Sequence, residues 1–148
     1  MNLLCGFYIG GFYFSVPIDR VQEVLKKASP TPVPGAPRAV AGLLNLRGAI
    51  VTVLDIRPQL AVPAANAGEP GAHLLLIDGS EIVALRIDRI GEVVPVPADS
   101  FEPPPDTLRG PARALITGAY KLPDRLMLAL NLDVALNTDA VAPEGKSA

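Results

Sequence analysis

The amino-acid sequence predicts an all-β fold, built from two related lobes within one compact domain. The 148-residue chain is 49% hydrophobic and 19% charged, which is typical of a globular protein with a sizeable core. Its 16 prolines and 13 glycines argue against long helices. Short runs of aromatic and β-branched residues alternate with turn signals along the whole chain, as expected for a succession of short strands.

A β-hairpin is the first predicted element. Residues 4–9 and 12–18 are rich in aromatic and β-branched residues. The Gly10-Gly11 pair between them suits a two-residue turn, because both turn positions need a positive φ. The chain is therefore expected to enter its first sheet at once.

A short helix is predicted next. Asp19 has the character of a helix N-cap, and Gln22 stands at the capping-box position three residues later. On a helix, Val21, Val24 and Leu25 would share one apolar face.

A proline-rich segment then leads into a second pair of strands. Residues 29–37 contain four prolines and are expected to be extended or turning, with Pro37 opening one helical turn that Gly42 ends. Residues 43–46 are predicted to form a strand and residues 49–55 a long buried strand, with Arg47-Gly48 as the turn between them.

The middle of the chain is predicted to be a linker followed by three strands. Residues 61–72 are rich in alanine, proline and glycine, which indicates a linker or surface loop. Strands are expected at residues 74–77, Glu81–Ile87 and 92–96, with a turn at Asp78-Gly79.

The last part is predicted to hold one more hairpin. Residues 99–113 form a proline-rich loop, and residues 115–122 and 125–132 form strands around a turn at Pro123-Asp124. Residues 133–136 would form a short terminal helix, and the tail over 138–148 is expected to be frayed.

An internal repeat supports the two-lobe prediction. Residues 18–25 match residues 87–94 without a gap, and residues 42–56 match residues 118–132. Sheets this small must close on themselves or cover their edges, so two barrel-like lobes with a shared apolar seam are expected. The predicted division is lobe one over roughly 4–60, a linker over 61–72 and lobe two over roughly 73–136. Other pairs that the repeat equates are Gly10 with Gly79, Leu46 with Leu122, Arg47 with Pro123 and Asp55 with Asn131.

Composition argues against several function classes. The formal charge is −2 with no basic run, so nucleic-acid binding has little electrostatic support. No apolar run is long enough to span a bilayer and no basic residue precedes the apolar start, so we expect a cytoplasmic protein without direct membrane insertion. The single histidine and single cysteine provide no metal-ligand spacing, and no cofactor is predicted.

The same residues resemble a known family, the CheW-like chemotaxis adaptor proteins. The most specific part is the run from Gly42 to Gly48, Gly-Leu-Leu-Asn-Leu-Arg-Gly, followed by a strand that ends in Asp55-Ile56-Arg57. Residues 18–25 and the proline-rich 31–37 agree with the family pattern, and the resemblance covers a domain over 1–137. Two residues depart from the pattern. Thr52 replaces the usual proline and Arg86 replaces the usual aliphatic residue.

The resemblance implies both a fold and a function. The fold would be two SH3-like five-stranded β-barrel lobes with short helices. The function would be that of a non-enzymatic scaffold that couples chemoreceptors to a CheA-type histidine kinase in chemotaxis-like signal transduction. Its partners would be the regulatory domain of the kinase, which has the same fold, and the signalling tip of the receptor.

The candidate partner-binding residues centre on Arg47. An arginine in a tight turn gains nothing for the core, whereas its guanidinium suits a carboxylate or backbone carbonyls on a partner. The alternatives are a solvated turn charge and an internal ion pair with Asp55. For the valines and polar residues near residue 22, the alternatives are core packing and an ordinary exposed face. The predicted site comprises Val21, Gln22, Glu23, Val24, Asn45, Leu46, Arg47 and Gly48.

Two further functions compete with this one. A CheW-like adaptor could serve a non-motility chemosensory pathway, such as one controlling pili or a second messenger. A small β-barrel ligand carrier or enzyme would need a pocket ringed by titratable groups. Asp55 fits a cap on the following turn better than an acid catalyst, and His73 and Cys5 have no catalytic partner nearby in the sequence.

Overall fold

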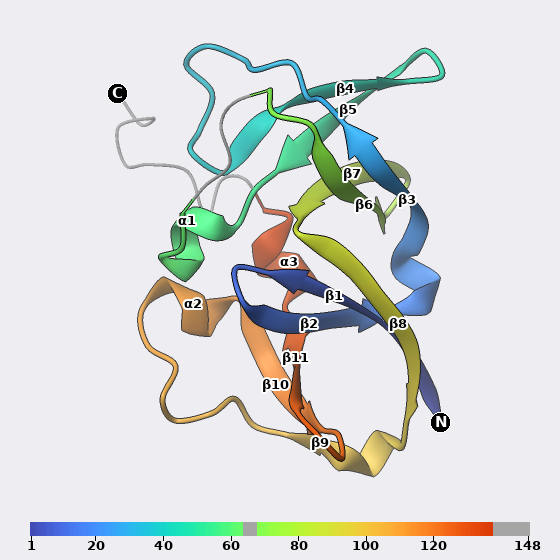
Figure 1. Cartoon of the computed structure of the whole chain (residues 1–148), viewed down its shortest axis with the longest axis vertical. Coiled ribbons are helices and arrows are strands. Elements are labelled where there is room, and N and C mark those ends of the chain that lie inside the picture. The colour runs from blue at the N-terminus through green and yellow to red at the C-terminus, as the bar shows by residue number, and fades with distance from the viewer. Residues whose placement is uncertain (64–67, 138–148) are drawn as a thin grey trace.

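The computed structural model describes residues 1–63 and 68–137, which form two β-sheets packed one over the other (Figure 1). Sheet A has the strand order β8-β1-β2-β11-β10-β9 and sheet B the order β3-β6-β7-β5-β4. The all-β prediction is confirmed. Sheet A contains β1 (Asn2–Ile9), β2 (Phe12–Pro17), β8 (Arg89–Val96), β9 (Phe101–Glu102), β10 (Ile116–Lys121) and β11 (Leu126–Leu130). Sheet B contains β3 (Val21–Ala28), β4 (Val40–Leu46), β5 (Ala49–Leu54), β6 (Gly71–Asp78) and β7 (Glu81–Ile87).

Helices are confined to single turns at strand ends. The short helix predicted at residues 133–136 is present one residue earlier, as α3 (Leu132–Ala135). The predicted frayed tail over 138–148 lies outside the described residues, as do residues 64–67 of the predicted linker. The helical turns are η1 (Ile18–Arg20), α1 (Arg57–Leu60), η2 (Ala98–Ser100), α2 (Pro111–Ala114) and α3 (Leu132–Ala135).

The Gly10-Gly11 turn forms as predicted. Gly10 and Gly11 join β1 to β2 with φ of 59° and 87°, values that a residue with a Cβ rarely adopts. The turn between β6 and β7 is Gly79-Ser80, one residue later than predicted, because the strand ladder extends to a pair between Asp78 and Glu81.

The helix predicted after Asp19 is wrong. Only the 3-10 turn η1 forms, without a side-chain cap, and the chain continues as the eight-residue strand β3. β3 pairs along its length with β6, and Val21 and Val24 pack against the main core. A capping signal contributes about 1 kcal/mol, which the β3–β6 ladder with its half-buried side chains outweighs.

Two smaller expectations hold only in part. Pro37 opens a single turn that closes at Val40, with Val40 N donating to Pro37 O at 2.9 Å, but Gly42 does not end it because β4 already starts at Val40. The loop predicted over 99–113 contains strand β9, which pairs with β10 and completes that edge of sheet A.

The repeat is visible in the sheets, but the sheets do not follow the predicted lobe boundaries. In each sheet a hairpin (β1–β2 or β6–β7) is flanked on one side by an antiparallel strand and on the other by a parallel one. The antiparallel strand beside each hairpin comes from the other half of the repeat. β8 pairs with β1 in sheet A, and β3 pairs with β6 in sheet B. Each lobe therefore contains strands from both predicted halves, 4–60 and 73–136.

Within the part of the chain that the structure describes, three apolar clusters hold the fold together. The largest lies between the sheets and includes Phe7, Phe14 and Leu85, each with no exposed surface. A smaller cluster around Val53 and Leu75 belongs to sheet B, and one around Tyr13 and Met127 belongs to sheet A. The expected apolar seam is therefore the main core, and each lobe keeps a small interior of its own.

The repeat also explains two side-chain contacts at helix starts. Asp55 Oδ1 accepts a hydrogen bond from the backbone N–H of Arg57 at 2.9 Å, at the start of α1. Its counterpart Asn131 accepts one from Val134 N at 3.3 Å, at the start of α3. Asn131 is thereby the N-cap of α3. At α1 the N-cap residue is Ile56, without a side-chain cap, and Asp55 lies one residue earlier, where it accepts from the first helical N–H and supports the turn as expected.

Arg86, which departs from the family pattern, is buried and anchors the chain before β6. Its guanidinium donates to the carbonyl oxygens of Glu69 at 2.6 Å and Pro70 at 3.3 Å. A Cβ on Gly71 would lie 2.5 Å from an Arg86 nitrogen, so glycine at 71 makes room for the guanidinium. Among the described residues, no helix has the length and apolar character needed to cross a membrane.

His73 is the only histidine of the chain and is fully buried on β6. Its Nδ1 lies 2.9 Å from the carbonyl oxygen of Gly71, and its Nε2 has no hydrogen-bond partner among residues 1–63 and 68–137. Burial lowers the pKa of His73, and the charge of Arg86 lowers it further. The hydrogen bond to the Gly71 carbonyl acts in the opposite direction, and the charges of Arg57 and Asp55 have smaller, opposing effects. The folded protein therefore holds a neutral imidazole.

Acidification from pH 7 to pH 5.5 is expected to lower the free energy of unfolding through His73. Because the pKa of His73 is lowered in the folded state, the unfolded chain takes up the proton first. The contribution of His73 to the free energy of unfolding is therefore fully present above about pH 6.5, and below that pH the free energy of unfolding falls by up to about 1.4 kcal/mol per pH unit. Urea denaturation across this range measures the effect. His73→Leu, which introduces the residue found at the repeat counterpart Leu4, should flatten the curve. Parallel curves for the two proteins would contradict the assignment.

Candidate protein-interaction site

The turn between β4 and β5 presents Arg47 to solvent. Arg47 and Gly48 have φ of 52° and 89°, the left-handed pair of a two-residue hairpin turn. The Asn45 side chain stabilises the turn by accepting a hydrogen bond from Gly48 N at 3.1 Å. The side chain of Arg47 is 69% exposed, in a backbone conformation that arginine rarely adopts.

The guanidinium of Arg47 pairs with Glu23 on β3. Arg47 Nη2 lies 2.6 Å from Glu23 Oε1, which brings together the two segments predicted to form the site. The alternative pairing with Asp55 does not occur, because Asp55 pairs with Arg57. An ion pair this exposed contributes about 0–1 kcal/mol to stability, so a carboxylate or carbonyl from a partner could displace Glu23 at little cost.

A β-bulge directs Gln22 toward the same region. The register between β3 and β6 shifts between Val21 and Glu23, so Gln22 is the additional residue in the ladder. Gln22 is exposed, whereas Val21 and Val24 pack against the core between the sheets. The two valines therefore have the core-packing role that was the alternative to partner binding.

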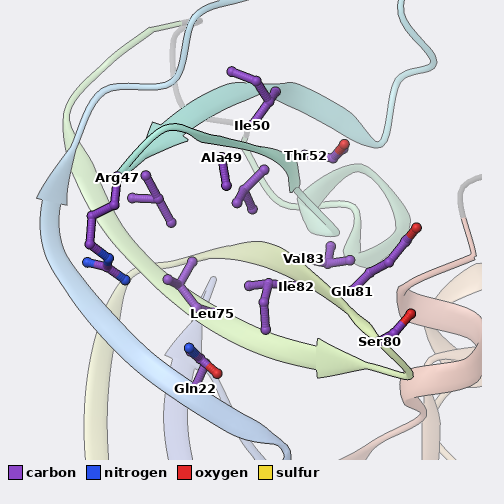
Figure 2. A pocket seen from close by; sticks show the side chains of 12 residues that line it. Gln22, Arg47, Ala49, Ile50, Thr52, Leu75, Ser80, Glu81, Ile82 and Val83 are labelled. Carbon is purple, nitrogen blue, oxygen red and sulfur yellow. The ribbon is translucent and has the colours of Figure 1, made fainter.

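A groove of about 670 Å³ lies beside the β4–β5 turn, at the end of sheet B that carries Arg47 (Figure 2). Arg47 and Gln22 lie at one end and Ser80 and Glu81 at the other, with apolar side chains between them. Buried Leu75 contributes to the lining, and Ile50, 65% exposed, stands on β5. The groove combines an apolar interior with polar ends, which suits a protein partner. Its complete lining is Gln22, Leu46, Arg47, Ala49, Ile50, Val51, Thr52, Leu75, Ser80, Glu81, Ile82 and Val83.

The predicted site is thus partly assembled by the fold. Gln22, Leu46 and Arg47 line the groove, Glu23 joins it through the ion pair, and Asn45 and Gly48 shape the turn.

Sequence reasoning missed the wall that β5 and the β6–β7 hairpin supply. Ile50 lies on a strand predicted to be buried throughout. Thr52, two positions later and therefore on the same face, was the available signal that this face is partly polar.

The described residues offer no alternative metal centre. No group of three or more His, Cys, Asp or Glu side chains within residues 1–63 and 68–137 is placed to hold a metal ion. The groove supplies hydrogen-bond donors, acceptors and apolar surface, and this arrangement favours binding.

Comparison with known proteins is consistent with this geometry. The model of the CheW-like domain family matches residues 4–140. The chemotaxis protein CheW of Rhizobium meliloti is 30% identical over 133 residues, which are 88% of this chain and 84% of that protein. The chemotaxis protein CheW of Helicobacter pylori is 29% identical over 134 residues, covering 90% and 81%. The scaffolding protein TtCheW of Thermoanaerobacter tengcongensis has the same fold, with a TM-score of 0.81, 23% identity and 97% of both chains covered.

Proposed function

The chain belongs to the CheW family and is a scaffold of chemotaxis-type signalling, and on that premise we propose that it joins a chemoreceptor to a CheA-type histidine kinase. We propose that it does so without catalysing a reaction. The partners would be the regulatory domain of the kinase and the signalling tip of the receptor, and the adaptor would act in the cytoplasm, where these domains meet.

The observation that supports this proposal most directly is the groove with Arg47 at its end. Arg47 is exposed, is held by a weak ion pair and adjoins uncovered apolar surface at Ile50. An arginine beside an apolar patch is typical of residues that dominate binding energy at interfaces. We therefore propose that a partner binds here and replaces Glu23 as the acceptor for Arg47.

The lobes would act as a rigid body between two partners. The main core spans both sheets, so a partner bound to sheet B is mechanically connected to sheet A. Each contact alone can be weak, since an array of receptors and kinases multiplies the contacts.

Charge reversal of Arg47 is expected to abolish coupling while the fold persists. Arg47→Glu would place two carboxylates together at Glu23 and remove the donor for the partner, so affinity for the partner at this site should fall at least about tenfold. Pull-down from lysate of the source organism, followed by identification of the captured proteins, measures the loss. The kinase and receptor recovered also distinguish motility from another chemosensory output.

Arg109→Glu provides the matched control, because Arg109 is exposed and lies outside the groove lining. Circular dichroism of both variants should match the parent protein. Equal capture of a histidine kinase and a receptor by Arg47→Glu and Arg109→Glu would refute a role for the groove, and capture of neither by the parent protein would refute the coupling function.

A further inference from the structure

The ends of the two lobes are related by the repeat, and only one of them is filled. The repeat equates the groove residues of sheet B with a set on sheet A. The equated clusters also correspond, since Leu44, Leu46 and Val51 lie in the sheet B cluster and their counterparts Tyr120, Leu122 and Met127 in the sheet A cluster. The counterparts of Leu75, Ile82, Gln22, Arg47 and Ala49 are Gly6, Tyr13, Gly91, Pro123 and Arg125.

In sheet A the tyrosine ring of Tyr13 fills the end of the lobe. The ring lies over Gly6 and Gly91, where added Cβ atoms would come within 2.5 Å and 3.3 Å of Tyr13 atoms. Tyr8 stacks on it with ring centres 4.7 Å apart, and Tyr13 is only 7% exposed. The glycines provide the space that this ring occupies.

An arginine covers the ring from outside. The guanidinium carbon of Arg125 lies 4.2 Å from the centre of the Tyr13 ring, and the same guanidinium donates to the hydroxyl of Tyr8. A cation at this distance is attracted to the negative face of an aromatic ring. The end of sheet A is therefore closed by an aromatic ring beneath an arginine.

In sheet B the arginine is present but the ring is absent. Ile82 replaces Tyr13, and the arginine stands at position 47, on the other side of the same turn from Ala49. The space is the groove of about 670 Å³, with Arg47 at its end and Ile82 and Leu75 in its lining (Figure 2). Among the described residues the guanidinium of Arg47 is hydrogen-bonded to Glu23 alone, and its side chain is 69% exposed, which leaves surface for a ring.

We propose that the groove receives an aromatic side chain of the protein partner, which packs on Ile82 and Leu75 and stacks beneath Arg47 in the place that Tyr13 holds in the other lobe. This inference rests on the proposed binding role of the groove and specifies the chemistry of its occupant. The positive rim complements the negative face of a ring, which an aliphatic side chain of equal size lacks.

A pair of small probes of matched shape tests the occupant without any partner protein. Para-cresol reproduces the tyrosine side chain, and 4-methylcyclohexanol has a similar shape without an aromatic face. Each probe is titrated into the isotope-labelled full chain, and the amide chemical shifts of the groove residues are followed by NMR. The dissociation constant from these shifts should be at least threefold lower for para-cresol than for 4-methylcyclohexanol. Equal affinity for the two probes, perturbation elsewhere only, or no perturbation at the groove by either probe would overturn the proposal.

Two variants locate the effect. Arg47→Met keeps an apolar stem but removes the cation, so it should remove the preference for para-cresol and leave weak binding of both probes. Ile82→Tyr should fill the groove from within, as Tyr13 does in sheet A, and abolish binding of both. Leu126→Tyr is the matched control, because Leu126 is the exposed counterpart of Ile50 in the other lobe. This variant should bind both probes as the parent protein does.

The probe titration and the pull-down fail independently. A chain that captures kinase and receptor through Arg47 yet shows no aromatic preference would retain the proposed function and refute the aromatic occupant. A chain that binds para-cresol beneath Arg47 but captures no kinase or receptor would retain the occupant chemistry and refute the coupling role.

Discussion

Replacing Arg57 by methionine is expected to lower the free energy of unfolding by about 3 kcal/mol. The guanidinium is 7% exposed and donates to Asp55 Oδ1 at 3.1 Å and to Asp88. Methionine fills a similar volume but leaves the carboxylate of Asp55, itself 9% exposed, without its cation. Breaking a buried ion pair from one side costs about 3–5 kcal/mol, and we expect the lower end because Asp88 is 43% exposed.

This arginine also connects the two sheets. Asp88, at the crossing from β7 to β8, accepts from Arg57 through one oxygen and from the backbone N–H of Gly10 through the other, at 2.7 Å. The network thus joins the end of β5 in sheet B to the β1–β2 turn in sheet A. We expect Arg57→Met to loosen the contact between the lobes as well as to destabilise them.

Urea denaturation followed by circular dichroism measures the loss. Asp88→Asn is the comparison, because it keeps an acceptor for Gly10 and changes a half-exposed group, so its cost should be about 1 kcal/mol. If Arg57→Met unfolds within about 0.5 kcal/mol of the parent protein, the buried pair does not stabilise the junction.

Gly42→Ala is expected to destabilise the protein by about 3 kcal/mol as well. An alanine Cβ would lie 2.4 Å from the carbonyl oxygen of Thr31, a backbone atom fixed in a bridge to Leu43, and Gly42 has a φ of 153°. The backbone cannot retreat without breaking the hydrogen bonds between Thr31 and Leu43, at 2.8 Å and 2.9 Å. Overpacking and backbone strain each cost about 1–3 kcal/mol.

Gly35→Ala separates the two contributions. Gly35 also has a positive φ, of 78°, but no described atom lies within 4 Å of an added Cβ, so only the conformational cost of about 1 kcal/mol should appear. Chemical denaturation of both variants gives the comparison. Equal losses for the two glycines would show that the contact with Thr31 is not limiting.

The sequence by itself determined the β character of the chain, the Gly10-Gly11 and Arg47-Gly48 turns and the internal repeat. These depend on local chemistry. Gly10 and Gly11 have the positive φ values that a tight hairpin needs, and alternating side chains define which face of a strand is apolar. The Gly42–Gly48 run and the strand that ends in Asp55-Ile56-Arg57 were sufficient to identify the family and to place Arg47 at a turn, which the structure shows to be exposed.

Only the tertiary structure decided whether residues 21–25 are helix or strand. The capping pattern at Asp19 and Gln22 is a local preference, whereas the ladder that β3 forms with β6 depends on residues about fifty positions away. The exchange of β3 and β8 between the sheets was hidden for the same reason, because a repeat identifies equivalent strands and does not specify which copy pairs with which.

The candidate site, too, was predicted in part by the sequence and completed only by the tertiary structure. Sequence located Arg47 and Glu23 separately, but their pairing needs the turn of β4–β5 to reach β3 at the opposite edge of sheet B. The groove wall from Ile50 and Ile82 arises where strands distant in sequence end together, so no local pattern marks it. Turn geometry and strand periodicity are local properties, whereas ion pairs and grooves exist only once remote segments meet.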